Sequence, residues 1–363
     1  MIIGAIVIIL LYLSLNYYIG YNLYSYINLL FGKLNKIMFY IIFSIFVLMS
    51  ILSFIKIPHA DIISFIGSIY LGLFVYFVLL FFIKDIFKLI FKFNTKTTII
   101  VNSLIMALVL STCIYGLINS RYIKLVSYDI DDNEIKGSYK IALISDLHLG
   151  SMLSESNMNN VIDKINDNNV DLVLIVGDLF NDNFNVINNP QKMVKKIKSI
   201  KSKYGIYMSL GNHDGGSTYS KMIDFINDSN IKLLNDEYEV INNDFILLGR
   251  VDGTPIGGFD GLKRKDTKEV LNSIDSNMPI IVMDHNPLNI DEYDKDINLL
   301  LSGHTHKGQM FPANIVTDNM YLVDHGIYES DKYPLTIVTS GAGTWGMPLR
   351  IGSNSEVVII NIN

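Results

Sequence analysis

The feature that most constrains this sequence is a series of four long apolar runs within the first 120 residues. They contain no charged residue and cover residues 2–20, 37–55, 62–83 and 97–120. At about 1.5 Å per helical residue, each run can cross a hydrocarbon core of about 30 Å. A soluble helical bundle would need polar outer faces, which these runs do not supply. We therefore expect a bundle of about four transmembrane helices in residues 1–120.

The first run has an alternative interpretation, a cleaved signal peptide. No basic residue precedes the run, however, and no A-x-A cleavage site follows it. Tyrosines cluster near its end and fit the aromatic belt of a membrane interface; they stand at positions 17, 18, 21, 24 and 26. These features favour a first membrane span over a signal peptide.

The loops between the runs predict the orientation in the membrane. The two loops on one side carry six lysines, at positions 33, 36, 84, 88, 92 and 96, whereas the other side carries Lys56, Arg121 and Lys124. By the positive-inside rule the side with six lysines is cytoplasmic. We therefore expect a multi-pass protein of the cell membrane, with everything after residue 120 outside the cytoplasm.

Charge is divided unevenly between the two halves. Residues 1–120 contain seven basic and two acidic residues, a net charge of +5. Because the formal net charge of the chain is -6, residues 121–363 carry -11. An acidic region is a poor partner for a phosphate backbone, so we expect no nucleic-acid polymer as a partner.

The second half shows the pattern of a different fold class. Residues 121–138 are polar, and we interpret them as a linker. Short apolar runs then alternate with polar, helix-like stretches at residues 157–168, 190–203 and 219–229. The eight runs are KIALIS, VDLVLIVG, GIYMSLG, FILLG, PIIVMD, INLLLSG, LTIVTSG and EVVIINI. Such Ile/Val/Leu-rich runs are typical of strands covered on both faces, which predicts an α/β sandwich in residues 139–363.

Potential metal ligands follow five of these apolar runs. In open α/β sheets, ligands bind at the carboxyl ends of the strands. Six of the seven histidines lie in the second half, and five of those six directly follow a predicted strand. The residues at the strand ends are Asp146, His148, Asp178, Asn212, His213, Asp214, His285, His304 and His306.

Each of these residues alone has an ordinary structural interpretation. Asp178 could cap a helix, Asn212 could be a turn residue, and His285 could be a core histidine. Their clustering at strand ends instead favours a metal site. Carboxylate, imidazole and amide oxygen ligands suit Mn, Fe, Zn or Co, and the lack of thiolates argues against a structural zinc finger.

The motif order in the second half resembles that of the calcineurin-like metallophosphoesterase superfamily. The order is D-x-H, G-D, G-N-H-D, a single H and then G-H-x-H, and the resemblance covers residues 139–363. The segments GHTHKGQMFP and TSGAGTWGMPLRIG are similar to the bacterial membrane-associated branch related to the YkuE and YaeI phosphoesterases. That branch often has glycine where this chain has Lys307.

The resemblance implies a site with two divalent metal ions that share one bridging carboxylate. One ion would be held by Asp146, His148, Asp178 and His306, and the second by Asp178, Asn212, His285 and His304. It also implies that His213 is the general acid and that Asp214 orients it. The implied activity is hydrolysis of a phosphoester by water activated between the two ions.

The substrate and the role of the first half stay open at the level of sequence. Tethering to a membrane makes a lipid-head phosphoester a reasonable substrate, with a nucleotide nearly as reasonable, and phosphodiesterase, phosphatase and pyrophosphatase activities are all compatible with the motifs. An alternative is a non-catalytic membrane receptor or scaffold, but no implied ligand is missing. The spans could also form a transport or sensing module, although their near lack of charge favours a plain anchor.

Overall fold

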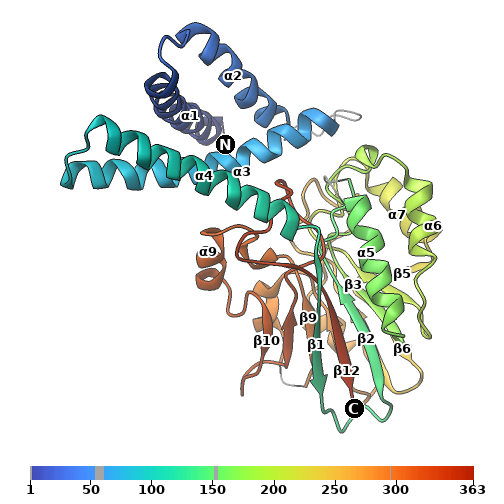
Figure 1. Cartoon of the computed structure of the whole chain (residues 1–363). Helices are drawn as coiled ribbons and strands as arrows, with labels where there is room; N and C mark the ends of the chain where they lie inside the picture. The colour runs from blue at the N-terminus through green and yellow to red at the C-terminus, as the bar shows by residue number, and fades with distance from the viewer. Residues whose placement is uncertain (1, 54–60, 151–153, 295) are drawn as a thin grey trace. The chain divides into compact units, whose positions relative to one another are not determined.

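The chain divides into two compact units. The computed structural model describes residues 2–53, 61–150, 154–294 and 296–363. One unit comprises Met1–Leu117 with Gly346–Leu349, and the other comprises Ile118–Trp345 with Arg350–Asn363. We call them the helical unit and the sheet unit, and each is described separately (Figure 1).

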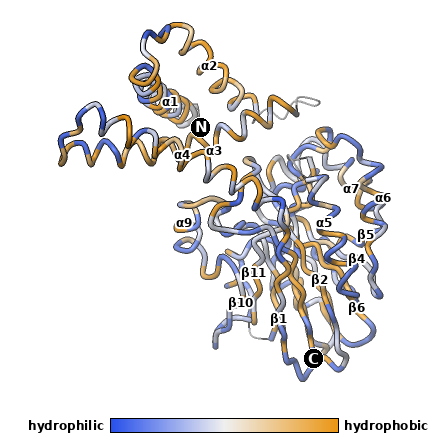
Figure 2. The backbone as a smooth tube through the Cα atoms, in the orientation of Figure 1, coloured by the Kyte–Doolittle hydropathy of each residue, from blue (hydrophilic) through white to orange (hydrophobic). Residues whose placement is uncertain are grey.

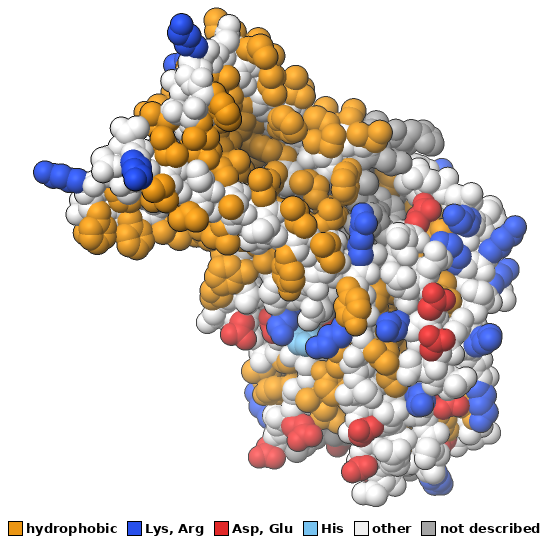
Figure 3. Space-filling model, in the orientation of Figure 1, with side chains coloured by type: hydrophobic (Ala, Val, Ile, Leu, Met, Phe, Trp, Pro, Cys, Tyr) orange, Lys and Arg blue, Asp and Glu red, His pale blue; other side chains and the backbone are white. Residues whose placement is uncertain are grey.

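The helical unit contains the four predicted apolar helices. They are α1 (Ile2–Phe31), α2 (Lys36–Ser53), α3 (Asp61–Ile90) and α4 (Thr95–Asn119). All four are long and apolar enough to cross a membrane. Figure 2 shows that the helices of this unit are mostly hydrophobic in sequence, and Figure 3 shows hydrophobic side chains over much of its visible surface. The loop with Lys56, which entered the orientation argument, lies outside the described residues.

The sheet unit contains two six-stranded mixed sheets among the described residues. The first has the order β1-β12-β2-β3-β4-β5, with strands Ile123–Ile130, Ser355–Ile362, Tyr139–Ile144, Leu172–Val176, Ile206–Ser209 and Ile231–Leu233. The second has the order β10-β11-β9-β8-β7-β6, with strands Gly326–Tyr328, Thr336–Val338, Leu299–Ser302, Ile280–Met283, Phe245–Gly249 and Glu237–Ile241. Strands β2 to β5 run parallel, as do β7, β8 and β9.

The two sheets pack face to face and carry helices on their outer faces. Residues such as Leu143, Leu174, Leu247 and Leu301 alternate inward and form one shared core between the sheets. The outer face of the first sheet packs against α5 (Ser154–Asp167), α6 (Pro190–Ile197) and α7 (Tyr219–Asp228), and that of the second against α8 (Thr267–Asn272) and the 3-10 helix η2 (Pro287–Glu292). Further short helices are η1 (Phe184–Val186), η3 (His306–Gly308) and α9 (Ala313–Met320). The predicted α/β sandwich is therefore confirmed.

The structure differs from the sequence interpretation at residues 121–138. Within this stretch, expected to be a linker, β1 forms an edge strand of the first sheet and pairs with β12 along its full length. Its burial alternates irregularly, because one side is exposed, so it lacks the continuous apolar run of an interior strand. Only three residues separate the end of α4 at Asn119 from the start of β1 at Ile123.

Candidate metal centre

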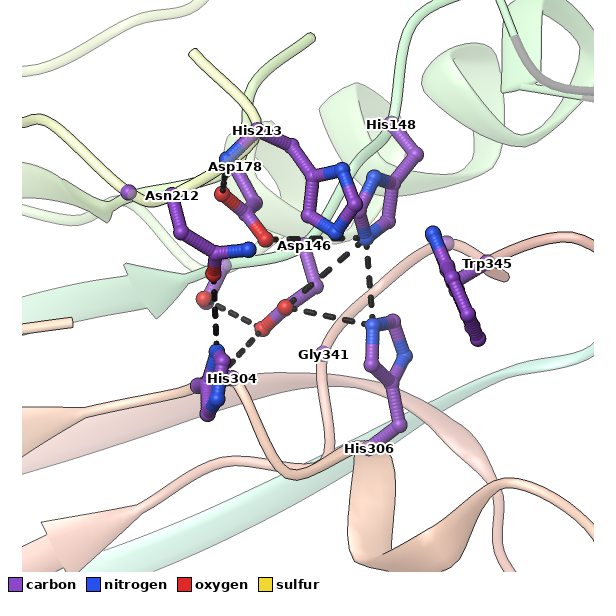
Figure 4. Close-up of polar contacts among 12 residues, drawn as sticks. Asp146, His148, Asp178, Asn212, His213, His304, His306, Gly341 and Trp345 are labelled. Atoms are coloured by element: carbon purple, nitrogen blue, oxygen red, sulfur yellow. Dashed lines mark hydrogen bonds and ion pairs between the residues drawn. The ribbon is translucent and has the colours of Figure 1, made fainter. Parts of the chain in front are cut away.

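The predicted ligands meet where five parallel strands end. Loops after β2, β3 and β4 in the first sheet and after β8 and β9 in the second supply the side chains. Figure 4 shows these loops converging, with the imidazoles and carboxylates directed toward one another. The seven predicted ligands are all placed in this region; they are Asp146, His148, Asp178, Asn212, His285, His304 and His306.

The backbone is strained at the ligands themselves. Five of them have φ between +47° and +69°, a region that non-glycine residues seldom adopt. Such conformations persist only where surrounding contacts enforce them, and they concentrate at functional sites. The five are Asp146, His148, Asp178, His304 and His306.

Gly177, directly after β3, leaves room for His285, which follows β8 in the other sheet. Gly177 has φ +75°, and a Cβ atom there would lie 2.4 Å from Nδ1 of His285. The imidazole of His285 therefore fits only because residue 177 has no side chain. The G-D motif thus reflects both backbone conformation and close packing.

One group of possible ligands comprises Asp146, His148 and His306. The Nε2 atoms of the two histidines lie 3.1 Å apart, and Oδ1 of Asp146 lies 3.2 Å from Nε2 of His306. All three residues are buried. Two ring nitrogens that face each other so closely need a proton or a cation between them, because both otherwise present lone pairs.

A second group comprises Asp178, His285 and His304, with Asn212 beside it. Nε2 of His285 lies 3.1 Å from Oδ2 of Asp178, and Nδ1 of His304 lies 2.9 Å from Oδ1 of Asn212. Asp178 also faces the first group, since its Oδ2 lies 3.8 Å from Nε2 of His148. Asp178 is therefore placed between the two groups.

The hydrogen bonding of the cluster fits divalent metal ions. Nδ1 of His285 donates to the carbonyl of Val176 at 2.8 Å, so Nε2, which lies 3.1 Å from Oδ2 of Asp178, is the ring atom that could bind a metal. Among the described residues, Nε2 of His285 and Oδ1 of Asp146 are buried without a hydrogen-bond partner, despite nearby atoms. Buried polar atoms without partners are costly, so their convergence is best explained by bound cations.

Burial and neighbouring charge set the protonation states of the cluster. Burial lowers the pKa of His148 to about 3 and that of His304 to about 4, so both imidazoles are neutral at pH 7. Burial alone would raise the pKa of Asp146, but His306, His285 and His148 hold it well below its usual range. Neutral imidazoles and an ionised carboxylate are the forms that bind metal.

His213 contacts a carboxylate that the sequence analysis did not identify. Its Nδ1 lies within hydrogen-bond distance of Oδ1 of Asp182, and its ring centroid lies 4.9 Å from that of His148. Asp182 stands four residues after Asp178, in a polar loop without apolar periodicity. It resembles an ordinary turn acid in sequence, and only the fold brings it to His213.

Asp214 has a different role from the one expected. Its carboxylate accepts hydrogen bonds from the backbone N–H groups of Asp178, Phe180 and Gly211 at 2.8 to 2.9 Å. Burial, together with the nearby charge of Asp178, raises the pKa of Asp214 to about 7. Asp214 therefore ties the loop after β3 to the loop after β4, and the carboxylate observed at Nδ1 of His213 is that of Asp182.

Two buried arginines of the sheet unit bind other groups of the protein. Arg250 and Arg350 are completely buried. Arg250 forms an ion pair with Asp236 at 2.7 Å. Arg350 donates to the carbonyl of His306 at 2.8 Å and to that of Gly343 at 2.6 Å, and so holds the histidine loop in place.

Comparisons with known proteins agree with the motif resemblance. Residues 139–308 match the family model described as calcineurin-like phosphoesterase. The chain is 32% identical over 257 residues to an uncharacterized metallophosphoesterase of Campylobacter jejuni, covering 69% of this chain and 66% of that protein. It is 29% identical over 283 residues to the transmembrane protein with metallophosphoesterase domain of Danio rerio, covering 70% and 62%.

The YkuE resemblance is also confirmed. The metallophosphoesterase YkuE of Bacillus subtilis is 25% identical over 260 residues, covering 67% of this chain and 88% of that protein. This chain spans less than two thirds of the length of the Campylobacter jejuni and Danio rerio relatives.

Proposed function

Residues 139–308 form a calcineurin-like phosphoesterase domain, and from that premise we propose that the protein is a membrane-anchored, metal-dependent hydrolase of phosphoesters. The observation that carries the proposal is the pair of ligand groups with Asp178 between them. A carboxylate can share its two oxygens between ions about 3.5 to 4 Å apart. The neutral histidines and the unpartnered atoms of Asp146 and His285 support binding of two cations there.

The chain's own residues have distinct proposed roles. Asp146, His148, Asp178 and His306 would hold one ion, and Asp178, Asn212, His285 and His304 the other. When bound, two divalent ions of the Mn, Fe, Zn or Co class would acidify a water molecule and neutralise charge on phosphoryl oxygens.

His213 would supply the proton for the leaving oxygen. Because Nδ1 is engaged by the carboxylate of Asp182, Nε2 would be the ring atom that gives a proton to a substrate. Asp182 is the positioning residue, because it fixes the ring and stabilises its charged form. Asp214 holds the loop after β3 against the loop after β4, which would preserve the distance between Asp178 and His213.

The helical unit supports a proposal for the side of the membrane on which the reaction takes place. We propose that α1 to α4 each cross the membrane and that the sheet unit lies outside the cytoplasm, because the six lysines fall on the opposite side. A phosphatase fused after Asn363 should be active, while a reporter that fluoresces only in the cytoplasm should stay dark there. The substrate would be a lipid-head or nucleotide phosphoester.

Hydrolysis is tested with the full chain in detergent, stripped of metal and resupplied with Mn, Fe, Zn, Co or Mg. Bis(p-nitrophenyl) phosphate and p-nitrophenyl phosphate serve as diester and monoester. We expect turnover that depends on metal and that Asp178→Asn lowers by about a thousandfold or more, since metals contribute several kcal/mol to the transition state. The matched control is Asp163→Asn, which changes an exposed acid on α5.

The contrary result would be stoichiometric metal binding without turnover of either ester under any condition. If Asp178→Asn also left the cellular phenotype unchanged, the domain would be a ligand-binding receptor or scaffold. Thermal unfolding of each variant shows whether a lost activity reflects a lost fold.

A further inference from the structure

A short helix beside the metal centre exposes apolar side chains. None of the residues of α9 is buried, and Ile315, Val316 and Met320 are 52%, 64% and 58% exposed. Leu322, just after the helix, is 52% exposed, and Trp345 is 48% exposed. We call these five residues the apolar rim. Exposed aliphatic side chains on a helix that contributes nothing to the core suggest a binding surface.

Helix α9 is fixed to the loop that carries the two histidines. Gly308 ends η3 with φ +68°, and a Cβ atom there would lie only 2.2 Å from the backbone nitrogen of Asn314. Beyond the other end of the helix, the ring of Tyr321 lies 6.3 Å from the ring of His304. Figure 1 shows α9 beyond the ends of β9 and β10. The position of the rim is therefore set by the same loop that positions the ligands.

The rim residue Trp345 lies next to the metal centre, beside His213. Its backbone N–H donates to Oε1 of Gln309 at 2.8 Å, and its carbonyl accepts from Nε2 of Gln309 at 2.9 Å. Its ring centroid lies 5.9 Å from that of His213. In Figure 4 Trp345 stands on the side of His306, away from His304. Trp345 and Tyr321, which stands between Met320 and Leu322 in the chain, thus both lie close to the proposed site of phosphorus chemistry.

We propose that the apolar rim binds the acyl chains of a membrane lipid whose phosphoester is the substrate. The proposal rests on the proposed hydrolysis and chooses between its two substrate classes. A nucleotide presents a base with hydrogen-bonding edges, whereas Ile315, Val316, Met320 and Leu322 offer only aliphatic surface. Strand β1 also begins only three residues after the end of α4, so the first strand of the sheet unit follows an apolar helix directly in the chain.

Fluorescence tests the contact without relying on activity. Trp345 is the only tryptophan of the chain, so its emission reports on the rim directly. The full-length protein is placed in nanodiscs of phosphatidylglycerol with ordinary or brominated acyl chains. We expect brominated chains to quench the emission strongly and aqueous iodide to quench it weakly. Strong quenching by iodide with none by brominated chains would overturn the proposal.

Activity tests whether the contact selects the substrate. Each lipid is compared with the soluble ester of the same head: dioleoyl phosphatidic acid with glycerol 3-phosphate, and dioleoyl phosphatidylglycerol with glycerophosphoglycerol. In the double variant Val316→Ser, Met320→Ser we expect the ratio of kcat/KM for lipid over soluble ester to fall about tenfold or more, because two apolar contacts are lost. The matched control is Val240→Ser on β6, at the opposite edge of the sheet from β10, which should leave the ratio unchanged.

Failure of this inference differs from failure of the proposed function. If the wild type cleaves soluble esters as well as lipids, or if the double variant lowers both equally, the rim does not select lipid but the hydrolase stands. If no ester is cleaved by the wild type, the hydrolase fails, and acyl-chain quenching of Trp345 still decides whether the rim meets lipid.

Discussion

The helical unit and the sheet unit bury polar groups in contrasting ways. In the helical unit the exposed side chains are mostly apolar, and polar residues of α1 lie inside, with Asn16 only 3% and Asn22 only 7% exposed. Asn16 contacts Tyr70 of α3, Tyr26 of α1 lies 2.8 Å from Ser103 of α4, and Tyr12 of α1 contacts Ser50 of α2. The polar side chains of α1 therefore link it to all three other helices.

The sheet unit has an apolar core and concentrates its buried charge at the strand ends. Asp146, Asp178, His148 and His285 are each at most 1% exposed, and all are possible metal ligands. They contact one another, since Nε2 of His285 lies 3.1 Å from Oδ2 of Asp178 and Nε2 of His306 lies 3.2 Å from Oδ1 of Asp146. Their burial is costly without bound cations.

The difference separates two uses of buried polarity. In the helical unit, neutral polar groups of α1 contact groups of the other helices, which keeps the outer surface apolar and specifies how the helices pair. In the sheet unit, buried charged groups gather in two clusters that could hold metal ions. Lys84 is the exception in the helical unit: it is 8% exposed and contacts Asn22 and Asp85, so α3 carries a buried charge at the end of its apolar run.

The largest expected effect is on the buried arginine that holds the histidine loop. Arg350→Met would leave the carbonyls of Ser340 and Gly343 without donors, each costing about 1 to 3 kcal/mol, and would remove one of the two donors to the carbonyl of His306. We expect the sheet unit to lose at least about 3 kcal/mol, or very roughly 6 to 12 °C in Tm. The fluorescence of Trp345 follows this unfolding. Arg121→Met, at an exposed arginine, is the control. An equal loss of Tm in this variant would show that the hydrogen bonds of Arg350 do not account for the effect.

The next effect concerns chemistry alone. Asp182→Asn should lower kcat about 10- to 100-fold, because the carboxylate that positions His213 is lost. KM and metal content should stay near those of the wild type, since Asp182 lies outside the two ligand groups. Steady-state kinetics with metal analysis measures both, and Asp182→Glu should recover part of kcat. A loss of metal in Asp182→Asn would instead place this residue among the groups that support binding.

A buried carboxylate away from the ligands gives a pH-dependent effect. Burial alone would raise the pKa of Glu356, but His325 at 3.1 Å and hydrogen bonds from Ser340 and Thr339 lower it below 4.5. A depressed pKa contributes stability above the unfolded value that is lost as pH falls through the folded value. Glu356→Gln should therefore cost about 1 to 2 kcal/mol at pH 7 and progressively less below pH 4.5.

The stability cost of Glu356→Gln is measured as the difference in Tm between the wild type and this variant, at pH 7 and at pH 4. Glu329→Gln, at an exposed acid, is the matched control and should change Tm little at either pH. If the difference in Tm between wild type and Glu356→Gln stays constant from pH 7 to pH 4, the ionised form of Glu356 is not what stabilises the fold.

The sequence predicted the interior of the fold but not its edges. The eight apolar runs correspond to β2, β3, β4, β7, β8, β9, β11 and β12, which are the interior strands of the two sheets. The four strands that were missed are the four edge strands, β1, β5, β6 and β10. An edge strand buries less of its surface and needs no continuous apolar run, so its pairing partner is visible only in the fold.

The same reasoning applies to the site. The predicted ligands follow apolar strands in recognisable motifs, and the parallel strands bring them together. Asp182 neither directly follows an apolar strand nor belongs to one of these motifs. Its contact with His213 depends on how two loops pack. The motif gave Asp214 the role of orienting His213, but its three backbone hydrogen bonds could be seen only in three dimensions.

The smallest expected effect is that of removing one hydroxyl in the helical unit, Tyr70→Phe, and it is compared with the removal of a hydroxyl in the sheet unit. Tyr293→Phe removes a hydrogen bond to the carboxylate of Asp284 at 2.7 Å, and bonds to charged groups are worth about 1.5 to 3 kcal/mol. Tyr70→Phe removes the contact with Asn16, and such bonds between membrane helices average about 0.6 kcal/mol. Unfolding in mixed detergent measures Tyr70→Phe, with the exposed Tyr17→Phe as control. A cost for Tyr70→Phe above that for Tyr293→Phe would mean that the polar contacts of α1 do more than pair helices, and the plain-anchor interpretation would then give way to a transport or sensing module.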